Sequence, residues 1–184
     1  NRLLRQQIHI LITGSNSKLL SSELASHLTG RHHKIELYPF SFKDWCVMKE
    51  LDYTRLTTKN RGLISKAYDE YFRQGGFPEL INSEENHKEY INTLTDNIIS
   101  QDISRRYKIR NIDVLKKLTH HILNETPTII VKESLLNTIG IKSERTLGNY
   151  LLYLNQTYLI STINKYSAKS RERTRGEKLY AIDV

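Results

Sequence analysis

The stretch Gln7-Ile-His-Ile-Leu-Ile-Thr-Gly-Ser-Asn-Ser-Lys-Leu-Leu20 decides the fold class that we expect for this chain. Its apolar residues between Ile8 and Ile12 form a short run that can be buried on both faces of a sheet. The run ends in small polar residues, and a helical pattern follows as far as Leu28. A buried strand that ends in this way before a helix is typical of the ligand-binding edge of a doubly wound α/β sheet. Because only six residues precede Gln7, we expect the other strands of such a sheet to be missing from the chain.

Composition narrows the class of protein. The 184 residues are enough for one ordinary domain or two small ones, and the content of 38% hydrophobic residues with only 3 prolines argues against disorder. A single cysteine, Cys46, excludes a disulfide framework and a cysteine-rich zinc site, which favours the reducing cytoplasm. No apolar run reaches the length of a transmembrane helix, so we expect no contact with a membrane.

Charge divides the chain into a neutral part and a basic part. The first 104 residues carry 13 Lys and Arg and 13 Asp and Glu, whereas the remainder carries 15 against 7. The whole net charge of +8 therefore lies after residue 104. A basic half suggests a polyanionic partner such as nucleic acid, although a solvated basic surface is an equally good interpretation.

The hydrophobic periodicity and the positions of glycine and proline predict three regions, over 1–40, 41–104 and 105–184. The first holds the strand already described and a second strand over 35–38, where apolar and polar residues alternate before Pro39. The second region is predicted to be helical, with a sharp break at Gly75-Gly-Phe-Pro-Glu79. Its predicted helices cover residues 40–49, 60–72 and 84–104.

The sequence of the basic region predicts three helices and a hairpin. We expect helices over 113–123 and 132–138, with Gly140 as a left-handed stop, and a third helix capped by Ser143. Two strands, over 158–163 and 178–184, flank a basic loop over 165–177. This order predicts a winged helix-turn-helix with a long basic wing.

Several short motifs, taken in order, resemble a known family. They are Ile12-Thr-Gly-Ser-Asn-Ser17, Leu28-Thr-Gly-Arg31, Pro39-Phe-Ser-Phe42, Gly75-Gly-Phe-Pro-Glu79, Asp102-Ile-Ser-Arg-Arg-Tyr107, Ser143-Glu-Arg-Thr146, Asn149-Tyr-Leu-Leu-Tyr-Leu154 and Lys178-Leu-Tyr-Ala-Ile-Asp183. The chain resembles the prokaryotic AAA-type P-loop ATP-binding proteins that carry an appended C-terminal domain of unknown function. The resemblance extends over essentially all of the sequence.

This resemblance implies a fold and a set of nucleotide-site residues. The fold would be an α/β remnant of a P-loop ATPase, with two parallel strands plus helices, followed by a helical lid and a winged helix-turn-helix, mostly α overall. Asn16 would be the sensor near the γ-phosphate with Ser15 beside it, and Arg31 would reach a phosphate or a neighbouring subunit's nucleotide. Gly76 and Pro78 would close over the nucleotide base. Helix capping, the helix dipole and a plain helix-helix turn are the competing explanations of these residues.

The sequence departs from the family where the chemistry of ATP hydrolysis is concerned. It contains no GxxxxGK followed by Ser or Thr, and no apolar strand ending in Asp precedes Ile8. ATP and magnesium therefore belong to the parent protein and its missing N-terminal P-loop half, and this chain alone is not expected to hydrolyse ATP. We expect no cofactor and no metal site in this chain, because the histidine pairs lack the spacing of a zinc site. Asp183 could begin the acidic site of a nuclease-like fold, but the chain stops before a second carboxylate.

Two other functions remain open. In the first, the winged helix binds duplex DNA, with Arg145 and Asn149 at the start of its third helix facing base edges. The basic wing would then lie over phosphates through Lys169, Arg171, Arg173 and Arg175, although Glu144 is poorly placed for DNA. The cations at 105, 106, 108 and 110 could extend this basic patch. In the second, the chain is a protein-interaction module whose exposed first strand is covered by a partner or by a second copy in a homo-oligomer.

Overall fold

The computed structural model describes residues 11, 13–14, 33, 35–55, 57–81, 83, 86–164, 166 and 177–183. Most of the predicted first region, including the helix up to Leu28, lies outside these residues. Of the strand predicted over 8–12, only Leu11 is described, and its side chain is exposed. The basic wing between 167 and 176 also lies outside the described part.

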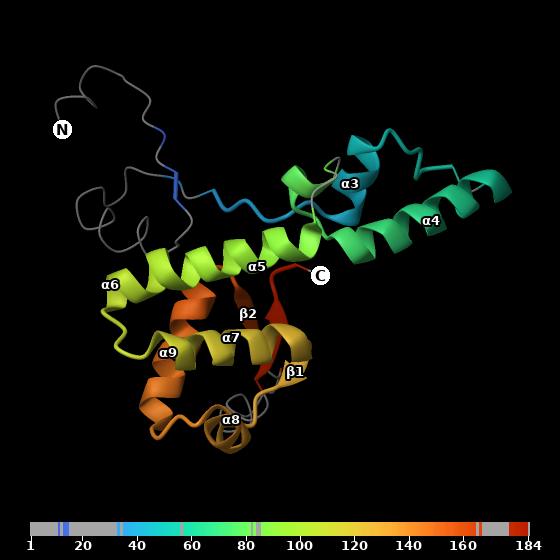
Figure 1. Ribbon diagram of the computed structural model, residues 1–184. Coiled ribbons are helices and arrows are strands. Elements are labelled where there is room, and N and C mark those ends of the chain that lie inside the picture. Colours follow the sequence, from blue (N-terminus) through green and yellow to red (C-terminus); the bar gives the residue numbers. More distant parts are fainter. Residues whose placement is uncertain are drawn as a thin grey trace.

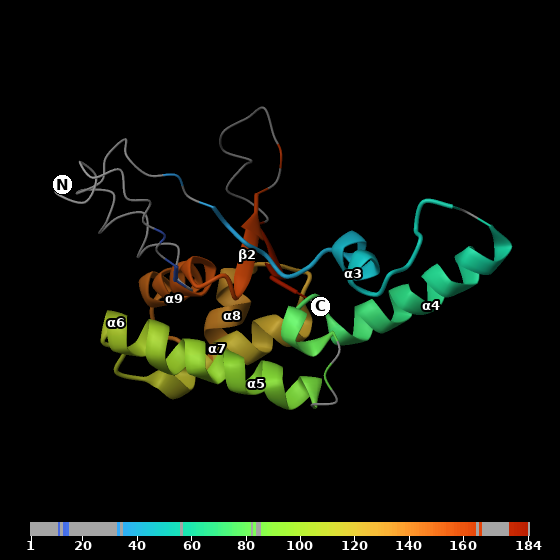
Figure 2. The same cartoon turned by 90° about the horizontal axis from the view of Figure 1, so that it is seen from above.

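The described part is mostly helical, with a small antiparallel sheet near the C-terminus (Figure 1). Both views show α3 and α4 at one end of the molecule and α6 to α9 at the other (Figures 1 and 2). The elements are α3 (Phe42–Met48), α4 (Thr58–Gln74), η2 (Pro78–Leu80), α5 (His87–Asn97), η3 (Ile98–Ser104), α6 (Arg105–Tyr107), α7 (Ile112–Glu125), β1 (Thr128–Ile129), α8 (Lys132–Ile139), α9 (Glu144–Gln156), β2 (Ile160–Ile163) and β3 (Lys178–Ala181).

The helices α3 and α4 pack around a small aromatic cluster. The side chain of Ser41 accepts a hydrogen bond from the N–H of Asp44, whose carboxylate accepts one from the N–H of Ser41 in return, which completes a capping box at the start of α3. Trp45 is buried with Ala67 and Ile81, and partly buried rings such as those of Phe42 and Tyr71 surround them. The sequence predicted both helices, and α4 extends by about half a turn at each end.

A single long helix connects this cluster to the C-terminal body. The sequence predicts it over 84–104. In the structure the side chain of Asn86 caps its start, and the helix continues through α5, the π-helical segment η3 and α6. Lys108 ends it in the left-handed conformation, with a φ of 50°. Ile99 and Ile103 of η3 are completely buried in the C-terminal core, so this core begins before residue 105, the predicted domain boundary.

The C-terminal body packs α7, α8 and α9 against a three-stranded sheet of order β1-β3-β2, with all pairs antiparallel. The three helices lie where the sequence predicted them, and Gly140 ends α8 with a φ of 78°, as expected. Ser143 stands at the N-cap of α9, but its side chain makes no capping hydrogen bond, contrary to the prediction. The strand β1 was not predicted. The core contains five leucines with no exposed surface: Leu115, Leu118, Leu147, Leu154 and Leu179.

The strand predicted over 35–38 is not formed. These residues run as an irregular trace toward α3 (Figure 1), and Ile35 and Leu37 are 75% and 91% exposed. An alternating pattern becomes a strand only when a neighbouring strand supplies hydrogen bonds, and none of the described residues pairs with this segment in a sheet. The expected pair of parallel strands is therefore absent from the described part of the chain. None of the helices described here has the length and apolar character that a bilayer crossing requires.

Candidate functional site

Two glycines form the turn between α4 and η2. Gly75 has a φ of 76°, and its N–H donates a hydrogen bond to the carbonyl of Tyr71 (2.8 Å). Gly76 is buried directly against the backbone of Phe40. A Cβ atom on Gly76 would lie only 2.2 Å from the oxygen of Phe40 and 2.9 Å from its nitrogen. Two backbones approach each other so closely here that position 76 requires glycine.

Gly76 joins three segments of the chain through hydrogen bonds. Its carbonyl accepts from the N–H of Phe40 (2.7 Å), and its own N–H donates to Oδ2 of Asp183 (2.7 Å). The hydroxyl of Tyr71 donates to the carbonyl of Phe40 (2.9 Å). Phe40 precedes α3, Gly76 follows α4 and Asp183 follows β3, so these contacts tie the aromatic cluster to the C-terminal sheet. We call Phe40, Tyr71, Gly76 and Asp183 the Gly76 junction.

The electrostatics of the junction favour its hydrogen bonds. Burial is the main cause that raises the pKa of Tyr71, and the carboxylates of Asp183 and Asp44 act in the same direction. The hydroxyl therefore stays protonated at neutral pH and remains a donor. An N–H that donates to a carboxylate makes a stronger hydrogen bond than one that donates to a neutral oxygen, which suits the contact of Gly76 with Asp183.

The segment before α3 contacts the C-terminal body at a second place. The hydroxyl of Tyr158 donates to Oε1 of Glu36 (2.7 Å), and the rings of Tyr158 and Tyr38 meet edge to face with centroids 6.2 Å apart. Tyr158 follows α9 with a φ of 58°, a conformation that an L residue adopts rarely. Residues 35–40, which we call the linking segment, thus contact the C-terminal body through Glu36 and Tyr38, and their last residue, Phe40, is connected to it through Gly76.

The exposed face of α9 is the second candidate site. Arg145, Asn149, Leu152 and Gln156 follow one another at spacings of four, three and four residues, so they lie along one stripe of the helix. The first three are exposed, and Leu152 keeps 49% of its surface. The opposite side of α9 supplies Leu147 to the core. The start and middle of the stripe therefore form an exposed surface with a cation (Arg145), an amide (Asn149) and an apolar side chain (Leu152).

The end of α6 is attached to the last turns of α9. The rings of Tyr107 and Tyr153 are stacked, with centroids 3.7 Å apart and an angle of 9° between their planes. The hydroxyl of Tyr107 also donates to Oε1 of Gln156 (2.6 Å). Because Gln156 belongs to the exposed stripe of α9, the end of α6 borders that stripe at its C-terminal end.

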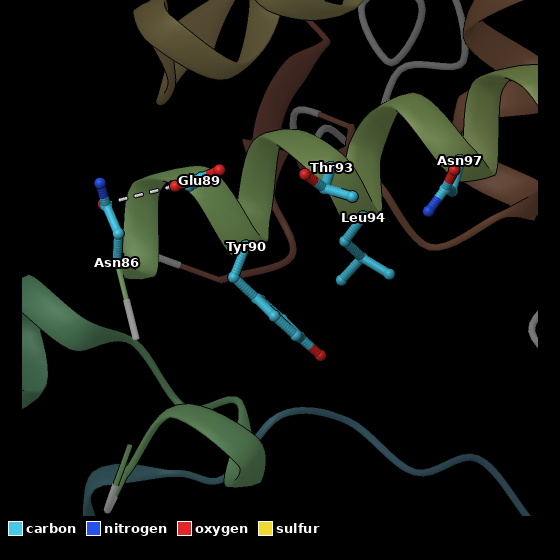
Figure 3. A pocket seen from close by; sticks show the side chains of 6 residues that line it. All are labelled: Asn86, Glu89, Tyr90, Thr93, Leu94 and Asn97. Atoms are coloured by element: carbon cyan, nitrogen blue, oxygen red, sulfur yellow. Dashed lines mark hydrogen bonds between the residues drawn. The ribbon is translucent and has the colours of Figure 1, made fainter. Parts of the chain in front are cut away.

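An open groove of about 430 Å³ runs along α5 (Figure 3). Tyr90 and Leu94 project into it, and polar side chains flank them. The ring of Phe77 meets that of Tyr90 with centroids 6.5 Å apart. The groove carries no group of charged side chains, and within the described ranges no three His, Cys, Asp or Glu residues are arranged to hold a metal ion. Its complete lining is Asn86, Glu89, Tyr90, Thr93, Leu94 and Asn97.

The structure places only some of the predicted site residues. Gly76 is buried in the junction, whereas Pro78 is exposed at the first position of η2. Arg145 and Asn149 are exposed on one face of α9, as the DNA hypothesis requires. The remaining predicted residues lie outside the described part of the chain and stay predictions: Ser15, Asn16, Arg31, Lys169, Arg171, Arg173 and Arg175.

The partnership of Asp183 with Gly76 was missed at the sequence level. The Gly-Gly-Phe-Pro break marked position 76, and Asp183 was considered only for a nuclease-like site. The two residues are separated by 107 positions, and no local pattern connects residues so far apart. Phe40 was missed for a similar reason, because its role depends on its backbone and not on its side chain.

Comparisons with known proteins give two family matches. Residues 65–184 match the model of a domain of unknown function (DUF8612), and residues 1–46 match the model of an AAA domain. The second match relates the N-terminal quarter of the chain to AAA proteins. The first match begins inside α4 and includes Gly76, Asp183 and all of the C-terminal body.

Two relatives are similar over nearly the whole chain. An uncharacterized protein of Methanocaldococcus jannaschii, MJ1544, is 36% identical over an alignment of 189 positions, gaps included. The alignment covers 99% of this chain and 43% of the relative. An uncharacterized protein of Haemophilus influenzae is 31% identical over 178 residues, which cover 94% of this chain and 43% of that relative. The chain thus spans less than half the length of the curated relatives it matches. No solved structure matches the chain.

Proposed function

The chain belongs to the family of the domain of unknown function DUF8612, and on that premise we propose that it is the coupling portion of an AAA-type ATP-binding protein. In this proposal residues 1–40 belong to a nucleotide-binding part, and the helical cluster of α3 and α4 acts as its lid. The C-terminal body is a winged helix-turn-helix that responds to the lid. The P-loop and the magnesium ligands are supplied by the missing N-terminal half.

The Gly76 junction is the observation that carries this proposal. The linking segment lies within the residues that match the AAA domain, and Phe40 at its end is held by Gly76. Gly76 is held in turn by Asp183 at the end of β3. A displacement of the linking segment must therefore either break these hydrogen bonds or move β3. Short backbone hydrogen bonds of this kind transmit a rigid-body movement between two packed parts of a protein.

The N–H of Gly76 is not available to bind a phosphate. The N–H of Gly76 already donates to the carboxylate of Asp183, and a carboxylate at this position would repel a phosphate. We expect no micromolar binding of ATP to the isolated chain in a calorimetric titration, and a clear binding isotherm would contradict the assignment of the phosphate site to the missing half.

Hydrogen exchange in the complete protein tests the coupling. Addition of a non-hydrolysable ATP analogue should change the exchange rates of the amides of Gly76, Phe40 and strand β3. The Asp183→Ala variant should still bind the analogue but should show no change at β3. As a matched control, Asp69→Ala removes an exposed carboxylate of α4 and should behave like the unmodified protein. If the analogue binds and exchange at Gly76 and β3 stays constant, the coupling proposal is wrong.

A second function, binding of duplex DNA, is favoured by the C-terminal body. The order α7, β1, α8, α9, β2, β3 with the sheet order β1-β3-β2 supports the assignment of a winged helix-turn-helix, in which α9 is the recognition helix. Arg145 and Asn149 are free to meet base edges, since arginine pairs with guanine and asparagine with adenine. Titration of a duplex at several salt concentrations tests this function. An affinity that is undetectable or independent of salt would exclude it.

A further inference from the structure

Three exposed cations lie where the end of α6 meets α9. The segment 105–110 contains four Lys and Arg residues and no acidic residue. Arg105, Lys108 and Arg110 are exposed, and none of the ion pairs among the described residues includes them. Arg106 differs from them, because it is half-buried and its Nη1 atom is enclosed. We call the three exposed residues the cationic rim.

The fold holds this rim in a fixed position. Lys108 adopts the left-handed conformation that ends the long helix, and the N–H of Ile109 donates to the carbonyl of Ser104 (3.1 Å). Ile109 packs against the C-terminal core. The stacking of Tyr107 on Tyr153 attaches the same turn to α9. The rim residues are therefore attached to a rigid turn and not to a free loop.

The turn that carries the rim lies beside the C-terminal end of α9. Both views show the end of α6, the turn that follows it and α9 at one edge (Figures 1 and 2). The hydrogen bond from Tyr107 to Gln156 places the end of α6 at the C-terminal end of that stripe. The opposite end of the stripe carries Arg145. The exposed stripe thus begins at Arg145 and ends beside the turn that carries the cationic rim.

The distance along α9 matches the width of a DNA groove. Tyr153 follows Arg145 by eight residues, which corresponds to about 12 Å along the axis of an α-helix. The major groove of B-DNA is about 12 Å wide. When the first turns of α9 meet base edges in the groove, the rim at the far end of the helix lies close to the phosphates that border it.

We propose that Arg105, Lys108 and Arg110 bind the phosphate backbone of the duplex whose major groove receives α9. This inference rests on the proposed DNA-binding function and adds three residues to its surface. Contacts of this kind carry no sequence information. They fix the orientation of the recognition helix and add to the dependence of affinity on salt.

The test is a salt titration of duplex binding with two triple variants of the full chain. The rim variant is Arg105→Gln, Lys108→Gln, Arg110→Gln. The control variant is Lys43→Gln, Lys59→Gln, Arg61→Gln, which changes the net charge equally at exposed positions on α3 and α4, at the other end of the molecule. Affinity is measured by fluorescence anisotropy with a labelled duplex of about two helical turns. Circular dichroism confirms that both variants fold.

The expected result is a lower salt dependence for the rim variant alone. Each phosphate contact contributes about −0.9 to the slope of log K against log salt. Loss of three contacts should therefore make the slope of the rim variant less steep by roughly 2.7. Between about 50 and 200 mM salt the unmodified chain should then lose roughly 40-fold more affinity than the rim variant. The control variant should keep the slope of the unmodified chain.

The other outcomes separate the inference from the function on which it rests. If the unmodified chain binds the duplex and the rim variant keeps its full slope, the rim assignment is wrong and the DNA-binding function stands. If the unmodified chain binds no duplex, both are wrong. If the rim variant loses as much affinity for polyglutamate as for the duplex, the rim is a general anion surface and its assignment to DNA phosphates is overturned.

Discussion

Replacement of Gly76 by alanine tests whether the junction holds the two parts of the molecule together. The new Cβ would lie 2.2 Å from the oxygen of Phe40 and 3.1 Å from its carbonyl carbon, and these backbone atoms cannot rotate away. A forced shift of well-packed atoms costs about 1–3 kcal/mol. The same shift distorts the hydrogen bonds of Gly76 with Phe40 and Asp183, each of which contributes about 1 kcal/mol or more. We therefore expect the free energy of unfolding to fall by about 3 kcal/mol.

Urea denaturation followed by tryptophan fluorescence measures this loss. Trp45 is the only tryptophan of the sequence and is 1% exposed. It lies in the same aromatic cluster as Tyr71, a member of the junction. With a denaturant slope of about 2 kcal/mol per molar, a loss of about 3 kcal/mol lowers the midpoint by about 1.5 M urea.

Gly62 provides the matched control. It lies inside α4, and a Cβ on it would meet nothing within 4 Å. Gly62→Ala should raise the free energy of unfolding by about 0.5–1 kcal/mol, because alanine favours a helix interior more than glycine does. The two substitutions are chemically identical and should shift the midpoint in opposite directions. Equal midpoints for Gly76→Ala and Gly62→Ala would refute the role that we assign to Gly76.

Three further predictions concern the cluster and the core. Hydrogen bonds from Ser41 are the main cause that lowers the pKa of Asp44, so the stability that they add to α3 is present above the unfolded pKa of about 4 and is lost as the pH falls through the lower folded value. Helicity measured between about pH 5 and 2 should therefore fall less steeply in Asp44→Asn than in the unmodified chain. Burial raises the pKa of Cys46, so maleimide should label this thiol slowly at neutral pH in the folded chain and quickly in urea; rapid labelling without urea would contradict its burial. Leu118→Ala, at a completely buried position, should lower the free energy of unfolding by about 2–5 kcal/mol in urea titrations. Leu152→Ala, at a position that is 49% exposed, should change it by less than about 1 kcal/mol, and similar losses in both would be unexpected.

The helices were predictable because their signals are local. The buried residues Leu147, Tyr150 and Leu154 are spaced by three and four positions. This spacing identifies the buried side of α9 without any knowledge of its neighbours. Gly140 marked the end of α8 because a left-handed stop favours glycine. The change from α to π hydrogen bonding at η3 has no such signal, and the sequence predicts one regular helix there.

The strands predicted over 158–163 and 178–184 are found as β2 and β3, but the other strands were less predictable because a strand depends on a distant partner. The strand β1 is only two residues long and forms by pairing with Lys178 and Leu179, about 50 positions later. The linking segment has the alternation of a strand but forms none, since no described residue pairs with it. A period of two describes which side chains share a face and leaves open whether another strand is beside them.

The candidate sites, too, were predictable where they depend on local sequence and unpredictable where they depend on distant contacts. Arg145 and Asn149 could be assigned to the start of a helix and to one of its faces from the sequence alone, because both follow from a periodicity of 3.6 residues. The cationic rim could be recognised as a cluster of charge between 105 and 110, but its position beside that face follows from the stacking of Tyr107 on Tyr153. The junction of Gly76 with Asp183 was decided entirely by the packing of the chain.

The sequence by itself thus determined the helices, the glycine stop of α8 and the concentration of positive charge after residue 104, all of which depend on neighbours within a few positions. The tertiary structure alone decided that β1 forms and that residues 35–38 form no strand, why position 76 must be glycine and which distant residues share a surface. The physical reason is that hydrogen bonds and packing between remote segments form only when the whole core assembles, and a short stretch of sequence carries no record of its distant partners.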